Sequence, residues 1–157
     1  MDSIAIAGVD VPIGTKYVWG GQNLQNGVDC SGLVCEIANK AGLNWNDMTA
    51  ADMYNKFSPV VKNNMQVGDL VFFRTSKTNP NKISHVGIYI GDGKMLQSGS
   101  TSGTGIVDLS KYPYPIAGVR RNAQFSRAVQ SNSGSPSTTN PSTKQAVDPA
   151  RATGLLK

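Results

Sequence analysis

Apolar side chains in the first third of the chain recur at the spacing of an α-helix. From Ser31 onward they lie three or four residues apart, at Leu33, Val34, Ile37, Ala38 and Ala41, and Gly42 ends the run. A second, shorter helix is predicted over residues 49–57, with Thr49 as its N-cap. Residues 1–13 are expected to lead into the fold, and the Gly- and Asn-rich residues 14–29 to form a loop.

Beyond the helices the pattern changes to the short runs and alternation of β-strands. Candidate strands lie at residues 69–74, 84–90, 94–98, 105–109 and 116–121. Between the second and third, the sequence Gly-Asp-Gly at residues 91–93 favours a tight hairpin turn, because Asp-Gly adopts positive φ easily. Helices followed by an antiparallel meander predict an α+β fold.

The composition changes again near Gln130. Residues 131–143 are all Ser, Thr, Asn, Gly or Pro, which is typical of a linker or a disordered arm and not of a packed core. We therefore predict a folded domain over residues 1–121 and a Ser/Thr/Pro-rich C-terminal arm or linker over residues 122–157.

Charge and cysteine content narrow the classes of function. The net charge is +5 with no basic run, so loose attraction to an anionic polymer such as cell wall is expected, but not dedicated nucleic-acid binding. The chain has two cysteines and one histidine, too few for a tetrahedral zinc site, and neither a metal nor another cofactor is expected. Cys30 and Cys35 lie five apart on one predicted helix and point away from each other, so both are expected to be free thiols.

Cys30 is the candidate nucleophile. It lies where the Gly-rich loop meets the first helix, and the first turn of a helix presents free N–H groups and a partial positive charge. Both favour a thiolate, so a lowered pKa is expected for Cys30, and the same N–H groups are candidates to stabilise an oxyanion. The alternative is a structural cysteine, because a lone cysteine at a helix start is often a small buried apolar residue.

His85 is the only imidazole in the chain and the candidate base for Cys30. It opens a predicted strand and is expected on the face opposite to Val86, Ile88 and Ile90. Gln97 lies on the returning strand, nearly opposite His85, and its amide oxygen is expected to accept a hydrogen bond from the imidazole. None of these residues on its own indicates an enzyme. Their conjunction with the Gly-rich loop favours a cysteine hydrolase over a structural cysteine.

At these residues the sequence resembles the NlpC-type family of papain-like cell-wall cysteine peptidases. The matching segments, in order and in register, are YVWGG (17–21), DCSGLV (29–34), VGDLVFF (67–73), SHVGIYIG (84–91) and GVRR (118–121). The resemblance implies a papain-like core, with Cys30 as nucleophile, His85 as base and Gln97 as the third polar residue. It also implies substrate-binding roles for Tyr17, which lies beside the nucleophile, and for Asp29, Ser31 and Ser84, which line the pocket for the amino-terminal side of the substrate.

The resemblance further implies a stem-peptide endopeptidase of peptidoglycan, often cutting between D-γ-glutamyl and meso-diaminopimelate or Lys. The third polar residue is most often His in the family, so Gln97 favours a weaker enzyme. It leaves open a catalytically weak or inactive papain-like structural component of a tail assembly. A secreted effector, a cytoplasmic recycler of wall peptides and a lysin amidase are further alternatives.

The setting is a separate expectation. The first eight residues lack a basic segment and a long apolar stretch, so no signal peptide is expected, and no apolar run has the length of a membrane span. A wall hydrolase made in the cytoplasm without a signal must reach the wall by another route. We expect a phage tail or virion component that acts at the bacterial cell wall and contacts other virion proteins through its C-terminal arm.

Overall fold

A six-stranded antiparallel sheet with two helices on one face carries the fold. The structure is a computed structural model that describes residues 2–131. Its helices are α1 (Cys30–Lys40), α2 (Ala50–Lys56) and α3 (Ala123–Ser131), with short 3₁₀ turns at Lys62–Asn64 and Leu109–Lys111. Its strands are β1 (Ser3–Ile6), β2 (Val9–Pro12), β3 (Gln22–Asn23), β4 (Gly27–Val28), β5 (Ser58–Val60), β6 (Leu70–Phe73), β7 (His85–Gly91), β8 (Lys94–Gly99), β9 (Gly103–Asp108) and β10 (Gly118–Arg121).

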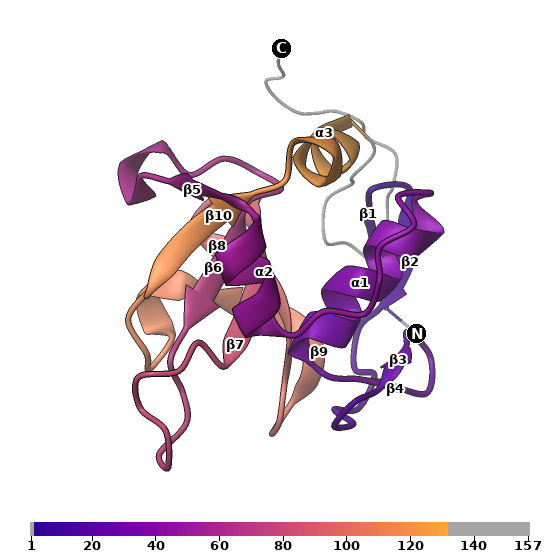
Figure 1. Ribbon diagram of the computed structural model, residues 1–157. Coiled ribbons are helices and arrows are strands. Elements are labelled where there is room, and N and C mark those ends of the chain that lie inside the picture. The colour runs from indigo at the N-terminus through magenta and orange to yellow at the C-terminus, as the bar shows by residue number, and fades with distance from the viewer. Residues whose placement is uncertain (1, 132–157) are drawn as a thin grey trace.

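The six strands of the main sheet follow the order β5-β10-β6-β7-β8-β9. Helix α1 contacts β7 and β8 on one side and β2 on the other, so it lies between the sheet and the β1–β2 hairpin (Figure 1). Helix α2 contacts β7 and β10 beside it. The start of α1 and the centre of the sheet are thereby brought together, which is the arrangement that positions the candidate site.

Each face of the sheet is covered by apolar side chains. The larger cluster joins the helices to the sheet and includes Leu33 and Ile37 of α1 with Val86 and Ile88 of β7, all at most 1% exposed. On the opposite face a smaller cluster is built on Val71, Phe73 and Met95, each 0% exposed. The sheet is therefore buried on both faces, and side chains that alternate along β7 all enter apolar surroundings.

The β7–β8 hairpin forms at the predicted Gly-Asp-Gly turn. Gly91, Asp92 and Gly93 all have positive φ, at 96°, 55° and 72°. The register of the two strands shifts between Tyr89 and Gly91, so that Ile88 pairs with Leu96. This irregularity decides which residues of β8 reach the start of β7.

A buried ion pair fastens β10 to the segment before β6. The Asp69 carboxylate is 0% exposed and accepts from Arg121 Nε at 2.6 Å and from Nη2 at 2.8 Å. It also accepts from the Gln66 N–H at 2.8 Å. Because both carboxylate oxygens accept hydrogen bonds, the buried charge of Asp69 is compensated. The ion pair therefore holds the start of β6 beside the end of β10.

The structure confirms the predicted α+β class, but the order of elements differs from the prediction, because β1 to β4 precede α1 and α2, and α3 follows the last strand. The N-terminal lead-in is a correction: it forms the hairpin β1–β2, which turns at Ala7 and Gly8 with positive φ. The predicted N-cap at Thr49 is confirmed, because its side chain accepts from the Asp52 N–H in a capping box.

The domain boundary predicted at residue 121 precedes α3. Phe125 and Val129 of this helix are 0% exposed and belong to the larger apolar cluster, so the folded unit extends to Ser131. The predicted arm beyond that residue lies outside the described part of the chain. Within residues 2–131, no helix is long and apolar enough to cross a membrane.

Candidate active site

Helix α1 begins at Cys30 because Asp29 caps it. Asp29 has an extended backbone, and its Oδ1 accepts from the Gly32 N–H at 2.6 Å. Its Oδ2 accepts from the Gly20 N–H at 2.9 Å, so one carboxylate ties the Gly-rich loop to the helix. A Cβ at Gly32 would collide with the carbonyl oxygen of Gly21, so this position has no room for a side chain. The thiol is therefore held at a helix start against a closely packed loop.

The Cys30 side chain lies against the beginning of β7. The residue is 6% exposed, and its Sγ is 3.8 Å from the carbonyl oxygen of Ser84. The backbone N–H of Val86 also interacts with the thiol. Ser84 and Val86 flank His85 in the sequence, so the fold brings the candidate nucleophile to the backbone on both sides of the candidate base.

Burial raises the pKa of the Cys30 thiol to about 11, and the nearby Asp29 carboxylate adds to the rise. Backbone N–H groups of Val86, Ser31 and Cys30 oppose it. The expected lowered pKa is therefore wrong for the unliganded protein. The N–H groups of the helix start are present as predicted, but the loss of hydration at a nearly enclosed sulfur outweighs them. Cys30 is a neutral thiol near pH 7.

His85 and Gln97 are joined by a hydrogen bond of 2.5 Å between Nε2 and Oε1. The amide oxygen accepts, so Nε2 carries the proton and Nδ1 keeps a free lone pair. Because Ile88 pairs with Leu96, the register places Gln97 beside Gly87, and the contact with His85 runs diagonally across the hairpin. The predicted partner of the imidazole is present, although not directly opposite.

Burial lowers the pKa of His85, against a smaller rise from the hydrogen bond with Gln97. The imidazole is therefore neutral near pH 7 and able to accept a proton. His85 does lie on the face opposite to Val86, as expected, but this face is covered, and the residue is only 8% exposed.

Two aromatic rings that pack on His85 were not predicted from the sequence. The rings of Tyr112 and His85 are stacked, with centroids 6.0 Å apart and 19° between their planes. Phe73 contacts both rings, at 5.9 Å from His85 and 4.7 Å from Tyr112. Tyr112 follows a 3₁₀ turn and belongs to no strand, so no periodicity marks it. Its alternation with Pro113 and Tyr114 is the one local sign of a rigid aromatic segment.

The residues with expected substrate-binding roles lie on different elements around the thiol. Tyr17 bridges to Val28 beside the loop, and burial raises its pKa to about 12, with the Cys30 and Asp29 charges adding to the rise. Ser31 is buried, and its Oγ donates to Asp29 Oδ1 at 3.3 Å. These residues therefore gather on the loop side of the thiol.

Ser84 reaches the thiol only through its carbonyl group. Its Oγ accepts from the Thr75 N–H at 2.8 Å and contacts Thr75 Oγ1 at 2.9 Å. Asp29 likewise uses both carboxylate oxygens within the protein. Both residues shape the site, and their hydrogen-bonding groups are already engaged.

The site offers thiol and imidazole chemistry. Within residues 2–131, no group of three or more His, Cys, Asp or Glu side chains is arranged to hold a metal ion. The assembled groups are a thiol, a neutral imidazole oriented by an amide, and N–H groups at a helix start. This set suits acyl transfer through a covalent thioester.

Comparisons with known proteins point to one family. The sequence model of the NlpC/P60 family matches residues 14–119, which is more than half of the chain. The chain is 36% identical over 103 residues to the probable endopeptidase YafL of Escherichia coli strain K12, covering 64% of this chain and 41% of that protein. It is 40% identical over 91 residues to the murein DD-endopeptidase MepH of the same strain, covering 57% and 33%.

Solved structures give the same result. NlpC1 from Trichomonas vaginalis is similar with a TM-score of 0.63 and 30% identity, over 69% of this chain and 39% of that chain. The predicted papain-like fold is thereby confirmed. The chain spans less than half the length of these relatives.

Proposed function

Because the chain belongs to the NlpC/P60 family, we propose that it is a cysteine peptidase that cleaves the stem peptides of peptidoglycan. The observation that carries the proposal is that separate elements bring the Cys30 thiol to the backbone beside His85, and Gln97 to the imidazole of His85. The Cys30 thiol of α1 lies against the backbone of β7 at His85, and Gln97 of β8 holds the imidazole. The names of the relatives, which include an endopeptidase of murein, support the substrate class.

The resting pair is neutral, which fixes how the first step begins. His85 Nδ1 accepts the proton from Cys30 Sγ as the sulfur attacks the carbonyl carbon of the scissile amide. The negative charge that develops on the carbonyl oxygen is met by N–H groups at the start of α1. Gln97 keeps the imidazolium in place through Nε2.

Collapse of this adduct breaks the C–N bond. The imidazolium returns its proton to the departing amine, and a thioester remains on Cys30. A water molecule, deprotonated by His85, then attacks the thioester carbon. The acid product leaves, and the sulfur recovers its proton. Atoms and charges balance over the cycle without a cofactor.

A defined substrate tests the reaction class. A synthetic stem peptide with a D-γ-glutamyl bond to meso-diaminopimelate or Lys is incubated with the protein, and the products are read by mass spectrometry. The proposal expects two fragments from cleavage of one bond within the peptide. An intact peptide, under conditions where the protein is folded, contradicts it. On a second, sugar-linked stem peptide, release of the whole peptide from the lactyl group would instead indicate an amidase.

A catalytically inactive wall-binding or tail component is the second candidate. The raised pKa of Cys30 and the amide at Gln97 favour it, since both reduce the driving force for thiolate formation. Alkylation by iodoacetamide in the absence of substrate does not separate the two candidates well, because a buried neutral thiol reacts slowly in either case. Turnover of the stem peptide separates them directly.

A phage tail or virion is the setting we propose for this activity. Its support is the Ser/Thr/Pro-rich composition of residues 131–143, which is typical of a tether to a larger assembly. Mass spectrometry of purified phage particles checks it. Peptides of this chain in washed virions would support the proposal, and their recovery only in the free protein fraction would contradict it.

A further inference from the structure

The loop that precedes Cys30 presents an apolar side chain to solvent. Trp19 is 85% exposed and its neighbour Val18 is 38% exposed; the third large exposed apolar residue in the described range is Val61. Trp45, the other tryptophan, packs on Phe57 and Phe125 instead. Two of three such residues thus fall side by side in one loop, beside the candidate active site.

This exposure occurs on a well-fixed backbone. The Gly21 N–H donates to the Val18 carbonyl at 2.8 Å, and the Val18 N–H donates to the Val28 carbonyl at 3.1 Å. A Cβ at Gly27 would collide with the Val18 side chain, so the loop and β4 lie in close contact. The Trp19 backbone is therefore held in place by its neighbours, and its indole projects into solvent from a fixed point of the loop.

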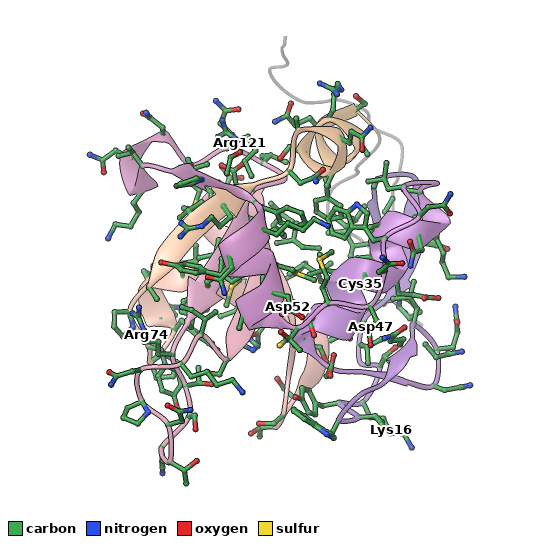
Figure 2. The ribbon with its side chains drawn as sticks, in the orientation of Figure 1. Lys16, Cys35, Asp47, Asp52, Arg74 and Arg121 are labelled. Carbon is green, nitrogen blue, oxygen red and sulfur yellow. The ribbon has the colours of Figure 1, made fainter. Side chains whose placement is uncertain are left out.

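A hollow of about 440 Å³ opens on the same segment. Its lining residues are Pro12, Gly14, Thr15, Lys16, Gln25 and Asn26. Figure 2 shows Lys16 at the end of the molecule that carries β3 and β4. The Lys16 carbonyl accepts from the Val28 N–H at 3.3 Å, so the hollow borders the strand that leads into Cys30. Its side chains offer one ammonium and two amides, which can donate to hydroxyl and N-acetyl oxygens.

We propose that Trp19 and this hollow bind an amino sugar of the glycan strand from which the stem peptide hangs. The inference rests on the proposed function and names a further part of its substrate. A stem peptide is joined by its amino-terminal end to the lactyl group of a muramic acid residue. The proposal places that end of the peptide toward Tyr17, so that the sugar reaches the next residues of the same loop. The flat indole suits the apolar face of a pyranose, and Lys16, Gln25 and Asn26 suit its polar edge.

Two substrates that differ only in the sugar test this inference. Cleavage is measured on the disaccharide-linked stem peptide and on the same peptide without sugar. For Trp19→Ala we expect kcat/KM on the sugar-linked substrate to fall about 10-fold, mainly through KM, with the free peptide unchanged. Val61→Ala is the matched control, because it also truncates an exposed apolar side chain but lies outside the loop. Equal losses on both substrates, or no loss on either, would overturn the inference and leave the peptidase proposal standing.

A binding measurement decides the matter even if neither substrate is cleaved. In a Cys30→Ala, Trp45→Phe variant, Trp19 is the only tryptophan and reports its own surroundings by fluorescence. Titration with the disaccharide of N-acetylglucosamine and N-acetylmuramic acid is expected to shift the emission in a saturable way. No shift up to millimolar disaccharide would contradict the inference. A shift with the free peptide alone would also contradict it, by assigning Trp19 to the peptide.

Discussion

The Gln97 amide oxygen lies 2.5 Å from Nε2 of His85, reached diagonally across the β7–β8 hairpin. This hydrogen bond leaves the lone pair of Nδ1 available, and in the proposed mechanism Nδ1 accepts the proton of Cys30. Gln97→Ala removes the acceptor and lets the ring rotate, so we expect kcat to fall about 10- to 100-fold with little change in KM. Steady-state kinetics on a stem peptide measure this. An unchanged kcat would show that packing alone orients the imidazole.

Substitution of Gln97 by Glu separates orientation from electrostatics. A carboxylate at this position still accepts from Nε2–H and also favours the imidazolium, so the pKa of His85 should rise. The acid limb of the pH–rate profile should therefore move to higher pH, while kcat at its plateau stays within a few-fold of the wild type. A profile that does not move would contradict the assignment of this limb to His85.

Tyr112 is expected to keep the His85 ring in its orientation by stacking on one of its faces. Tyr112→Ala removes the stacked partner and should lower kcat about 5- to 10-fold. Tyr112→Phe is the matched variant, since it keeps the ring and loses only the hydroxyl, and it should retain nearly full activity. If Tyr112→Phe falls as far as Tyr112→Ala, the hydroxyl rather than the stack is the active feature.

The pKa shifts of His85 and Cys30 predict how the stability of the protein depends on pH. The pKa of His85 is lowered on folding, so the unfolded chain binds the extra proton first, and stability falls as the pH drops below about 6.5. The pKa of Cys30 is raised to about 11, so the unfolded thiol ionises first, and stability falls again above about pH 9. Urea unfolding across this range should show a plateau between the two limits. In Cys30→Ala the loss at high pH should be smaller, with Cys35, whose pKa is also raised to about 11, accounting for part of what remains.

The ion pair between Asp69 and Arg121 should contribute measurably to stability. Asp69→Asn leaves a cation without its partner, and we expect a loss of about 2–3 kcal/mol in the free energy of unfolding. The loss is below that of a fully enclosed pair, because the Arg121 side chain is 31% exposed and can be hydrated. Lys40→Ala, which breaks the exposed pair with Glu36, is the control and should change stability by no more than about 0.5 kcal/mol. Equal effects of the two variants would contradict the role of burial.

Elements that depend on residues close together in the sequence were the ones that could be predicted. The start of α1 next to Cys30 and the hairpin that carries His85 and Gln97 were predictable from helical spacing and from a Gly-Asp-Gly turn. The hairpin β1–β2 has such a signal as well, since Ile4, Ile6, Val9 and Val11 alternate about a turn, and the prediction of a lead-in does not use it. Helix α3 offers Asn122, whose Oδ1 accepts from the Phe125 N–H, but only two of its apolar side chains, Phe125 and Val129, are fully buried.

The pKa of Cys30 and the position of Tyr112 depend on the tertiary structure. N–H groups at a helix start lower the pKa of a thiol, but the packing of α1 on β7 buries the sulfur, and burial raises the pKa by more. Tyr112 meets His85 because the chain between β9 and β10 crosses the sheet, and no periodic pattern in the sequence fixes that path. The burial of a side chain and its contacts with residues distant in the sequence cannot be obtained from local patterns in a single sequence.

The two cysteines provide the most direct test of the central claim. Both thiols are buried with pKa values raised to about 11, but Cys35 lies in the middle of α1, against the carbonyl oxygens of Asn46 and Met48. Figure 2 shows it pointing inward from that helix.

Purified peptidoglycan is digested with the wild type, Cys30→Ala and Cys35→Ala, and the muropeptides are compared by mass spectrometry. We predict that Cys35→Ala releases the same cleaved stem peptides as the wild type, and that Cys30→Ala, confirmed as folded by circular dichroism, releases none. Equal muropeptide profiles for Cys30→Ala and the wild type would contradict the account.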